Sequence, residues 1–323
     1  MDALPDIDYD AHPAYQPFRG EDPALRRRAL EHLEPLVEAK LQTLERDRAV
    51  FEHRASGSDN TVVDKLARNG AVGVTLPAPL LGRARDAVKR FDGRLQRRIA
   101  ALHGHGRELK FSDIEDVLCV NGRWRAGAEE AKAAIDQIIR KTWVIEIAEA
   151  YYPDCEASLS GAALRRNVER PASFIGADEP PAPKAASMHI DSSGRPTFNG
   201  VIYLSDVGDE QGPFRYVTGS NHWRWDLRDR AIRKAVDDAA LDFGVNNRLF
   251  LNLPSDLRRK ANFGHDLEDG SALSRALLAG ERTFTSQDCD MALFDSDGVH
   301  RGGQVRRGHR SSILFVLKIM RRR

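Results

Sequence analysis

Hydrophobic residues recur at helical spacing in three stretches of the first half of the chain, at about residues 24–51, 79–102 and 128–150. Apolar positions that repeat every three or four residues are typical of amphipathic helices, so each stretch predicts a helix with a packing face. Pro35 lies inside the first stretch, and we expect it to kink or split that helix. A short apolar run at 71–76 predicts a strand between the first two helices.

The pattern changes after residue 153, where short strand-like runs bounded by Gly, Pro, Asn and Asp take over. They lie at roughly 158–168, 187–191, 197–205, 213–218, 283–285, 291–295 and 310–319. Many short strands at close spacing predict an antiparallel sandwich or barrel. Residues 222–282 are helical and charged instead, for example at 227–241, and we interpret them as an insertion able to cover one mouth of the barrel. Three prolines within 177–184 predict a loop before the strand at 187–191.

Composition narrows the class of protein. The chain has 323 residues, of which 41% are hydrophobic and 30% charged, and this favours a soluble globular protein over a disordered one. Lys and Arg number 49 against 48 Asp and Glu, so charge gives no reason to expect nucleic acid or a membrane as a partner. Cys119, Cys155 and Cys289 are too few for a disulfide framework. Since residues 1–10 lack a secretory signal and no apolar stretch could span a bilayer, we expect a cytoplasmic protein.

The candidate chemistry begins at His189 and Asp191. In a strand, residues two apart project from the same face, so these side chains would point together. His300 follows a turn signal at 295–298, after the apolar run 291–294. Two imidazoles and one carboxylate on one face are the pattern of non-haem Fe(II) sites with open positions opposite. The alternative interpretation is a surface histidine beside a turn-forming aspartate.

Arg310 and Ser312 start the apolar run that follows His300, and both would lie on one face of that strand. A guanidinium in an apolar strand is costly unless it meets an anion. Its planar fork suits a carboxylate, and a neighbouring hydroxyl adds a hydrogen bond. The alternative is an ordinary salt bridge from Arg310 to Asp295 or Asp297.

The order of these motifs resembles the phytanoyl-CoA dioxygenase-like family, which belongs to the Fe(II)- and 2-oxoglutarate-dependent oxygenases. The matching features are His189-X-Asp191, the stretch Gly-Pro-Phe-Arg-Tyr-Val-Thr-Gly-Ser-Asn-His at 212–222, His300, and Arg310-X-Ser312. The family typically has a Gly-Pro-Leu-Arg-like stretch that ends in Pro-Gly-Ser-His.

This chain departs from that family pattern in two places. Thr218 replaces the proline, and Asn221 is inserted before His222, which we interpret as a structural histidine. The resemblance covers roughly residues 60–320. It explains neither residues 1–57 nor the insertion at 222–282.

The resemblance implies an α+β fold with a mainly β core, namely a double-stranded β-helix (a cupin-like jelly-roll) with flanking N-terminal helices and a helical insertion. We expect an N-terminal helical extension at 1–57 and an oxygenase domain at 58–323. Within that domain the jelly-roll core would span about 155–323, with the insertion at about 222–282.

The resemblance also implies roles for individual residues. His189, Asp191 and His300 would be catalytic and would ligate iron. Arg310 would hold the distal carboxylate of 2-oxoglutarate, and Ser312 would assist. Further candidates share strand faces near this site: Asn199 and Tyr203 would approach the co-substrate, and Arg165 and Asn167 would line the substrate pocket, against the alternative of ordinary surface charge.

The expected activity is hydroxylation of a small molecule in natural-product or other specialised biosynthesis. The cofactors would be Fe(II), 2-oxoglutarate and O2, with ascorbate as the reductant in vitro, and the protein would be a monomer or homodimer. Asp191 favours hydroxylation because related halogenases lack this carboxylate. One alternative keeps the cofactors but ends in desaturation, epoxidation or ring formation. Another is a cupin-like protein that binds a metal or ligand without catalysis.

Overall fold

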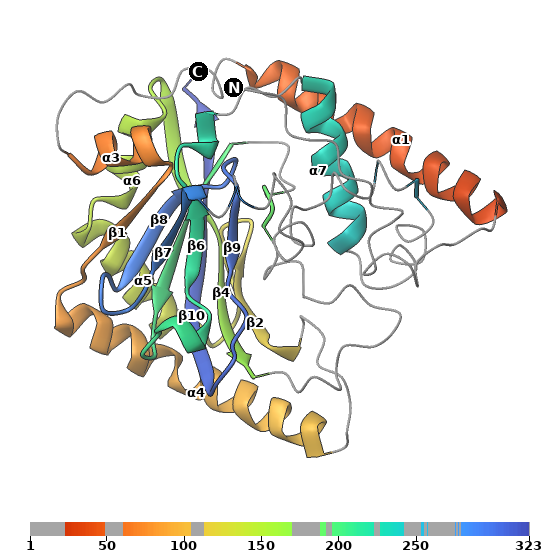
Figure 1. Ribbon diagram of the computed structural model, residues 1–323. Coiled ribbons are helices and arrows are strands. Elements are labelled where there is room, and N and C mark those ends of the chain that lie inside the picture. Colours follow the sequence, from red (N-terminus) through yellow and green to blue (C-terminus); the bar gives the residue numbers. More distant parts are fainter. Residues whose placement is uncertain are drawn as a thin grey trace.

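The computed structural model describes an α+β protein with two antiparallel sheets and helices packed against the larger one (Figure 1). The described residues are 23–48, 61–104, 113–169, 188–191, 196–222, 227–241, 253–254, 257, 275, 277 and 279–322. The proline-containing stretch at 177–184 lies outside them, as does most of the expected insertion beyond 227–241. No helix among the described residues is long and apolar enough to cross a membrane.

The larger sheet has seven strands in the order β1-β8-β5-β10-β4-β2-β3. Every neighbouring pair is antiparallel. Its strands are β1 (Ala71–Val74), β2 (Glu115–Val120), β3 (Arg123–Trp124), β4 (Cys155–Val168), β5 (Thr197–Tyr203), β8 (Met291–Asp295) and β10 (His309–Arg321).

The smaller sheet has three strands in the order β7-β6-β9. They are β6 (Phe214–Val217), β7 (Glu281–Phe284) and β9 (His300–Gly302). His189 pairs with His300 in an antiparallel bridge, so the segment around residue 189 extends this sheet beyond β9. Short 3-10 turns, η5 (Asp209–Gln211) and η6 (Ser220–His222), flank β6.

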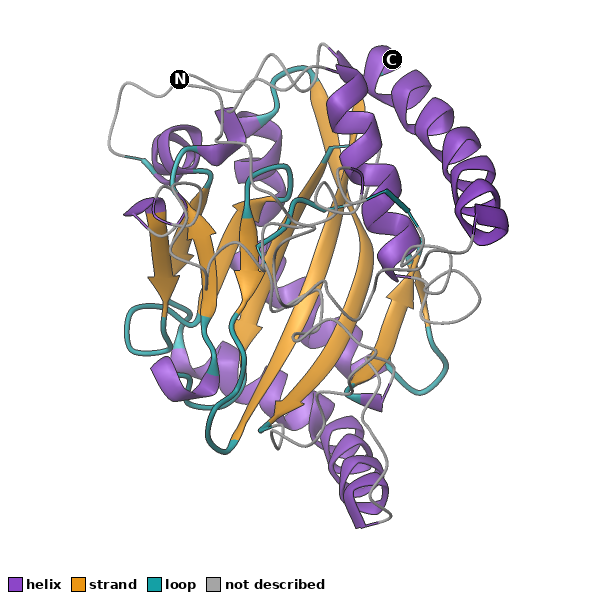
Figure 2. Ribbon diagram, turned by 45° about the vertical axis from the view of Figure 1, so that its right-hand side comes forward, coloured by secondary structure: helices purple, strands orange, loops and turns teal. Residues whose placement is uncertain are grey.

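Four helices cover one face of the larger sheet, behind the strands in Figure 2. They are α3 (Val62–Asn69), α4 (Ala78–Gly104), α5 (Glu129–Lys141) and α6 (Val144–Tyr151). The main core lies between them and the sheet, where fully buried Phe198 and Phe315 join Leu95 of α4 and Ile138 of α5 in one apolar cluster. On the opposite face, Ala292 and Phe294 of β8 pack with the smaller sheet in a further apolar cluster.

Two further helices form a separate unit beside the strands (Figure 1). They are α1 (Pro23–Arg46) and α7 (Leu227–Leu241), and we call them the helix pair. They pack through a second apolar cluster that includes Leu33 and Val37 of α1 and Ala231 and Ala235 of α7.

Two helix predictions need correction. The first predicted helix is not split at Pro35, since α1 continues through this residue and buries side chains before and after it, such as Leu33 and Leu44. The expected single helix at 128–150 is two helices, because Trp143 adopts the left-handed backbone conformation (φ 57°) between α5 and α6. Trp143 is 64% exposed, so it does not belong to the buried stripe that the spacing predicted.

Several elements lie where no element was predicted. α3 begins with a capping box in which Thr61 and Asp64 bond each other's backbone, and it ends at Gly70 (φ 77°). That Thr-X-X-Asp signal is visible in the sequence. Strands β2, β3 and β9 are short or polar, and pairing with longer neighbours makes them strands.

Candidate metal centre

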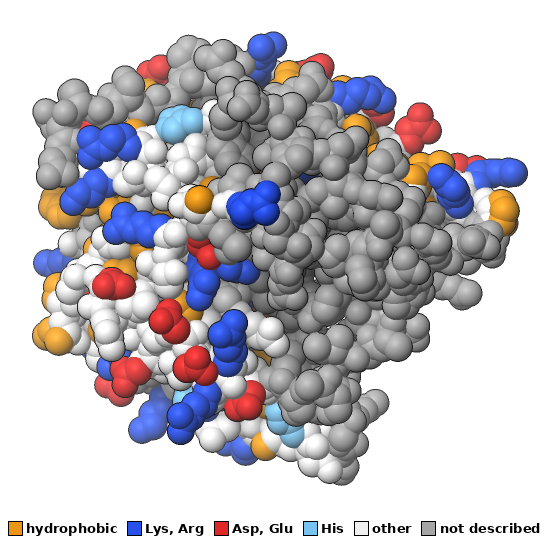
Figure 3. Space-filling view, in the orientation of Figure 1, with side chains coloured by type: hydrophobic (Ala, Val, Ile, Leu, Met, Phe, Trp, Pro, Cys, Tyr) orange, Lys and Arg blue, Asp and Glu red, His pale blue; other side chains and the backbone are white. Residues whose placement is uncertain are grey.

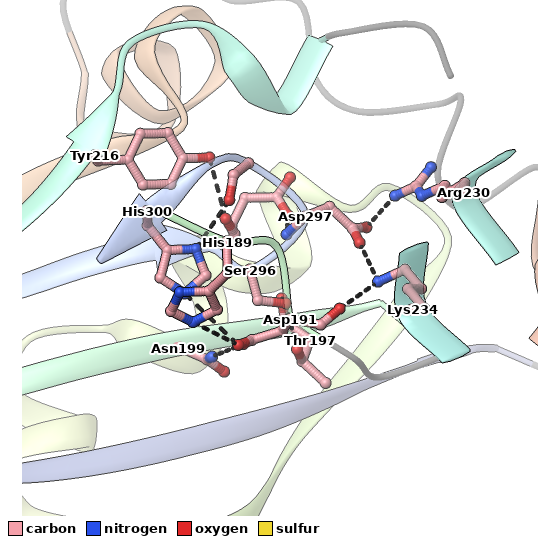
Figure 4. A network of polar contacts seen from close by, with 12 residues as sticks. His189, Asp191, Thr197, Asn199, Tyr216, Arg230, Lys234, Ser296, Asp297 and His300 are labelled. Carbon is pink, nitrogen blue, oxygen red and sulfur yellow. Dashed lines mark hydrogen bonds and ion pairs between the residues drawn. The ribbon is translucent and has the colours of Figure 1, made fainter. Parts of the chain in front are cut away.

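Three side chains from distant parts of the sequence meet between the two sheets. His189, Asp191 and His300 each offer one ligand atom, and these atoms all lie within 4.8 Å of one another. Asp191 Oδ1 is 3.8 Å from His189 Nε2 and 3.6 Å from His300 Nε2. The convergence of the three, predicted from the sequence, is therefore present (Figure 4).

Backbone pairing brings these residues together. The amides of His189 and His300 donate to each other's carbonyl oxygens at 2.9 Å, which aligns the two imidazoles on one face. The Asp191 amide donates to Ser296 O at 3.0 Å, within the turn that joins β8 to β9. Backbone pairing thus positions the three ligand residues relative to one another.

The orientation of His300 is set by the turn that precedes it. Its Nδ1 lies 2.8 Å from Gly298 O, so this nitrogen carries the proton and Nε2 presents its lone pair towards Asp191. The ring of Tyr216 lies parallel to it, with centroids 6.3 Å apart, and the Tyr216 hydroxyl donates to Asp295 O. A Cβ at Gly298 would lie 1.7 Å from the Tyr216 oxygen, so this close approach requires glycine.

Asn199 holds the carboxylate. Its Nδ2 donates to Asp191 Oδ2 at 2.8 Å, which leaves Oδ1 of Asp191 facing the two histidines. Asn199 is buried, and its own Oδ1 has no hydrogen-bond partner among the described residues. The prediction that Asn199 approaches the co-substrate is untested, and its observed contact is with the metal ligand.

The donor set fits a non-haem iron site. Two imidazole nitrogens and one carboxylate oxygen suit Fe(II), and the carboxylate lowers the net charge of the filled site. The unpartnered Asn199 Oδ1 beside Asp191 is an acceptor that a bound group could satisfy. The three ligand atoms would therefore suit a metal ion, and the amide oxygen of Asn199 would suit a hydrogen-bond donor on a further ligand of that ion.

Arg310 is buried on β10 without a carboxylate. It is 8% exposed, and its Nη1 donates to Gly303 O at 3.1 Å. Among the described residues, no acid forms an ion pair with it. Burial lowers the pKa of Arg310 to about 10, an effect that the Tyr203 phenol partly opposes. The guanidinium is therefore a buried cation for which the described structure supplies no counter-anion.

The alternative of a salt bridge to Asp295 or Asp297 is not found. Tyr151 donates to Asp295 Oδ2 at 2.9 Å. Both oxygens of Asp297 contact cations of α7, Arg230 and Lys234.

Strand register places the other predicted residues around Arg310. Ser312 pairs with Arg165 of β4 and with Tyr203 of β5, and Arg310 pairs with Asn167, so all five side chains share one sheet face. Arg165 also forms an ion pair with Glu115 at 2.6 Å.

The Tyr203 hydroxyl is engaged with the backbone. It donates to Phe284 O at 2.7 Å and accepts the Phe214 amide at 2.8 Å, and burial raises its pKa. Roles of these residues in binding cofactor or substrate remain predictions.

His222 is structural, as the sequence analysis expected. It ends the turn η6, and its Nε2 makes a short hydrogen bond with Ala67 O, away from the metal ligands. It does not belong to the group of ligand atoms.

The sequence analysis missed Arg230 and Lys234, although both contact the turn at Asp297. A signal was present, because Lys234 lies between the apolar residues Ala231 and Ala235 on the helix face that α7 buries. A lysine on such a face indicates a buried partner.

No family model and no curated protein matches the chain. Solved structures match it weakly. AviO1 from Streptomyces viridochromogenes Tue57 is 17% identical over 79% of this chain and 92% of its own (TM-score 0.40). SnoK, described as a non-haem α-ketoglutarate-dependent carbocyclase from nogalamycin biosynthesis, is 13% identical over 84% and 89% (0.45). HygX from Streptomyces hygroscopicus, solved with iron bound, is 14% identical over 81% and 87% (0.39).

At these identities and TM-scores, no activity transfers to this chain. The assignment of the metal centre rests on the chain's own side chains.

Proposed function

We propose that this protein is an Fe(II)- and 2-oxoglutarate-dependent oxygenase that acts on a small molecule. The observation that carries the proposal is the convergence of His189, Asp191 and His300, with Nε2 of His300 and Oδ1 of Asp191 directed at one another. The unpaired buried guanidinium of Arg310 supports it, because it offers a site for a carboxylate.

We further propose that the two sheets form a double-stranded β-helix within an oxygenase domain at 58–323. The strand order supports this, because from β4 onwards each described segment lies in the other sheet from the one before it, except that β6 and β7 are neighbours in the smaller sheet. β4, β5, β8 and β10 lie together in the larger sheet, whereas residue 189, β6, β7 and β9 make up the smaller one. The metal ligands then lie at one end of the space between the sheets.

The residues of the chain have separate tasks in this scheme. When bound, Fe(II) would supply the redox chemistry that activates O2, with two of the electrons that reduce O2 coming from 2-oxoglutarate and two from the substrate. His189, Asp191 and His300 would hold the metal, leaving its other positions open. The Gly298 carbonyl keeps the proton of His300 on Nδ1, and Asn199 keeps Asp191 oriented.

Arg310 would bind the distal carboxylate of 2-oxoglutarate through its planar fork, with Ser312 adding a hydrogen bond. We propose hydroxylation as the outcome, with Arg165 and Asn167 lining the substrate pocket. Desaturation, epoxidation or ring formation would use the same residues, because the position of the substrate decides between them.

The test is formation of succinate from 2-oxoglutarate under air, with added Fe(II) and ascorbate and a panel of small molecules. The expected result is succinate above background with the wild-type protein and none above background with His189→Ala. A protein that binds stoichiometric metal but never forms succinate would instead support the non-catalytic, cupin-like alternative.

A further inference from the structure

Lys234 is a fully buried lysine whose ammonium group reaches the metal centre. It lies on α7, and its side chain is 0% exposed. Nζ donates to the backbone oxygen of Asp191 at 2.7 Å and to Oδ1 of Asp297 at 2.8 Å. Arg230, one helical turn earlier, places Nη2 2.6 Å from Oδ2 of the same carboxylate (Figure 4).

These contacts join the two chain segments that carry the metal ligands. Asp191 is itself a ligand, and Asp297 lies three residues before the ligand His300. Asp297 is 3% exposed, and its amide donates to Asp295 Oδ1 within the turn between β8 and β9. One ammonium group therefore joins both segments, in addition to the backbone hydrogen bonds that pair them.

A buried ammonium group is costly unless it is fully paired. Removing a charge from water costs several kcal/mol per ion in real proteins, and only close, well-placed partners compensate for it. Burial lowers the pKa of Lys234, whereas Asp297 raises it. The contacts compensate for burial only while α7 stays seated against the turn, so the position of α7 and the geometry at Asp191 depend on each other.

α7 is also tied to the N-terminal part of the chain. Ala231 and Ala235 lie beside Lys234 on the helix and pack with Leu33 and Val37 of α1. Arg228 of α7 pairs with Glu38 at 3.6 Å on the exposed side of the helix pair. The helix pair is thus attached to the metal centre through Lys234 and Arg230.

We propose that Lys234 is a positioning residue that couples seating of the helix pair to metal binding. It holds the Asp191 backbone and the β8–β9 turn in the geometry that the metal needs. Because coupling between two binding events is reciprocal, metal binding must also stabilise the seated helix pair. This inference rests on the metal centre of the proposed function and gives α1 and α7 a role in it.

The first test measures Co(II) affinity of the metal-free protein by competition with a chelator. Lys234→Met keeps the length and apolar stem of the side chain but removes the donor. We expect its dissociation constant for Co(II) to rise about 10–100-fold, the range found when groups that orient metal ligands are removed. The matched control is Arg228→Met, which removes a cation from the same helix without touching Asp191 or Asp297, and it should stay within about 2-fold of wild type.

The second test separates positioning from general stability. In hydrogen exchange of the wild-type protein, Co(II) should slow exchange of the α1 and α7 amides, and in Lys234→Met this slowing should be lost although the sheet amides remain protected. If Lys234→Met does not fold, Arg230→Met gives the same test, because it removes the second anchor of α7 and leaves Lys234 in place. It should weaken Co(II) binding in the same direction.

Equal Co(II) affinity and equal metal-induced protection in wild type and the folded variant would overturn the proposed coupling and leave the proposed function intact. Failure of the wild-type protein to bind Co(II) would overturn the metal centre itself, and this inference with it. The two failures are therefore distinguishable.

Discussion

At the scale of single residues, two arginines on adjacent strands, Arg166 and Arg310, differ in whether the described structure supplies an acidic partner. Arg166 is part-buried and satisfied, because it donates to Asp92 and to Ser311 between α4 and the sheet. Arg310 is on the other face of the same sheet, and among the described residues it donates to the carbonyl oxygen of Gly303. Because Arg166 has an acidic partner and Arg310 has none among the described residues, we expect the buried charge of Arg310 to destabilise the protein unless an anion binds to it.

We predict that Arg310→Met stabilises the protein when no 2-oxoglutarate is present. Burial lowers the pKa of Arg310 below its ordinary value, to about 10, so the buried charge destabilises the folded state relative to the unfolded state, and does so in full at any pH below about 10. Removing that charge should raise the free energy of unfolding near neutral pH by about 1–4 kcal/mol, as for other buried charges replaced by apolar side chains. Urea unfolding at pH 7 measures this, and a loss of stability would contradict the absence of a counter-anion.

Asn199 gives a second prediction at this scale. Asn199→Leu removes the donor to Asp191 Oδ2 and should weaken metal binding about 10–100-fold, because the carboxylate is then free to rotate away from the histidines. Competition with a chelator measures the affinity, and unfolding in urea checks that the variant is folded. Unchanged affinity in a folded variant would show that Asn199 does not orient the ligand.

At the scale of elements, the sequence predicts a helix well where the apolar repeat continues over many residues, and it predicts poorly where one helix ends and the next begins. The stripe of α4 is buried as the spacing indicates, with Val88 and Phe91 in the core. The break between α5 and α6 could not be predicted, because Trp143 is apolar and fits the pattern, yet a left-handed residue there lets each helix pack separately. β9 has only three residues, and it is a strand because its backbone pairs with β6 on one side and with residue 189 on the other.

The turn between β8 and β9 orients the ligand His300 through the Gly298 carbonyl, and the substitution Gly298→Ala tests this role. A Cβ would collide with the Tyr216 hydroxyl, so the turn or the tyrosine must move, and the Gly298 carbonyl would lose its place against His300. We expect a loss of about 1–3 kcal/mol in stability together with weaker metal binding.

The matched control for that substitution is Gly82→Ala. Gly82 lies in α4 with open space around its Cα, so alanine should keep or raise stability by up to about 1 kcal/mol. Metal affinity should not change in this variant. If Gly298→Ala binds metal as tightly as Gly82→Ala does, the carbonyl of residue 298 does not orient His300.

At the scale of the whole molecule, the order of motifs along the chain predicted which residues meet, but not what surrounds them. The His189-X-Asp191 spacing, the later His300 and Arg310, and the resemblance of their order to a known family together predicted the His-Asp-His group. The attachment of α7 was not foreseen, because a buried Lys-Asp pair depends on tertiary packing. On the face viewed in Figure 3, acidic and basic side chains of the described residues are interspersed, in keeping with the near-neutral charge.

Metal should stabilise the whole molecule by mass action. At a Co(II) concentration 100 times its dissociation constant, the free energy of unfolding should rise by about 2.7 kcal/mol, provided that the unfolded chain does not bind the ion. A chelator should reverse the change, and His189→Ala should show none of it. Thermal unfolding with and without Co(II) measures the effect, and equal stabilisation of His189→Ala would place the ion elsewhere.

The most direct measurement is calorimetric titration of 2-oxoglutarate into the protein without oxygen, with and without Fe(II). We predict one binding event per chain, which needs Fe(II) and disappears in His189→Ala. In Arg310→Met the affinity for 2-oxoglutarate should fall about 30-fold or more, because removing one partner of a buried charge pair costs about 2–5 kcal/mol. Binding that is absent, or that is the same in all three proteins and without iron, would contradict it.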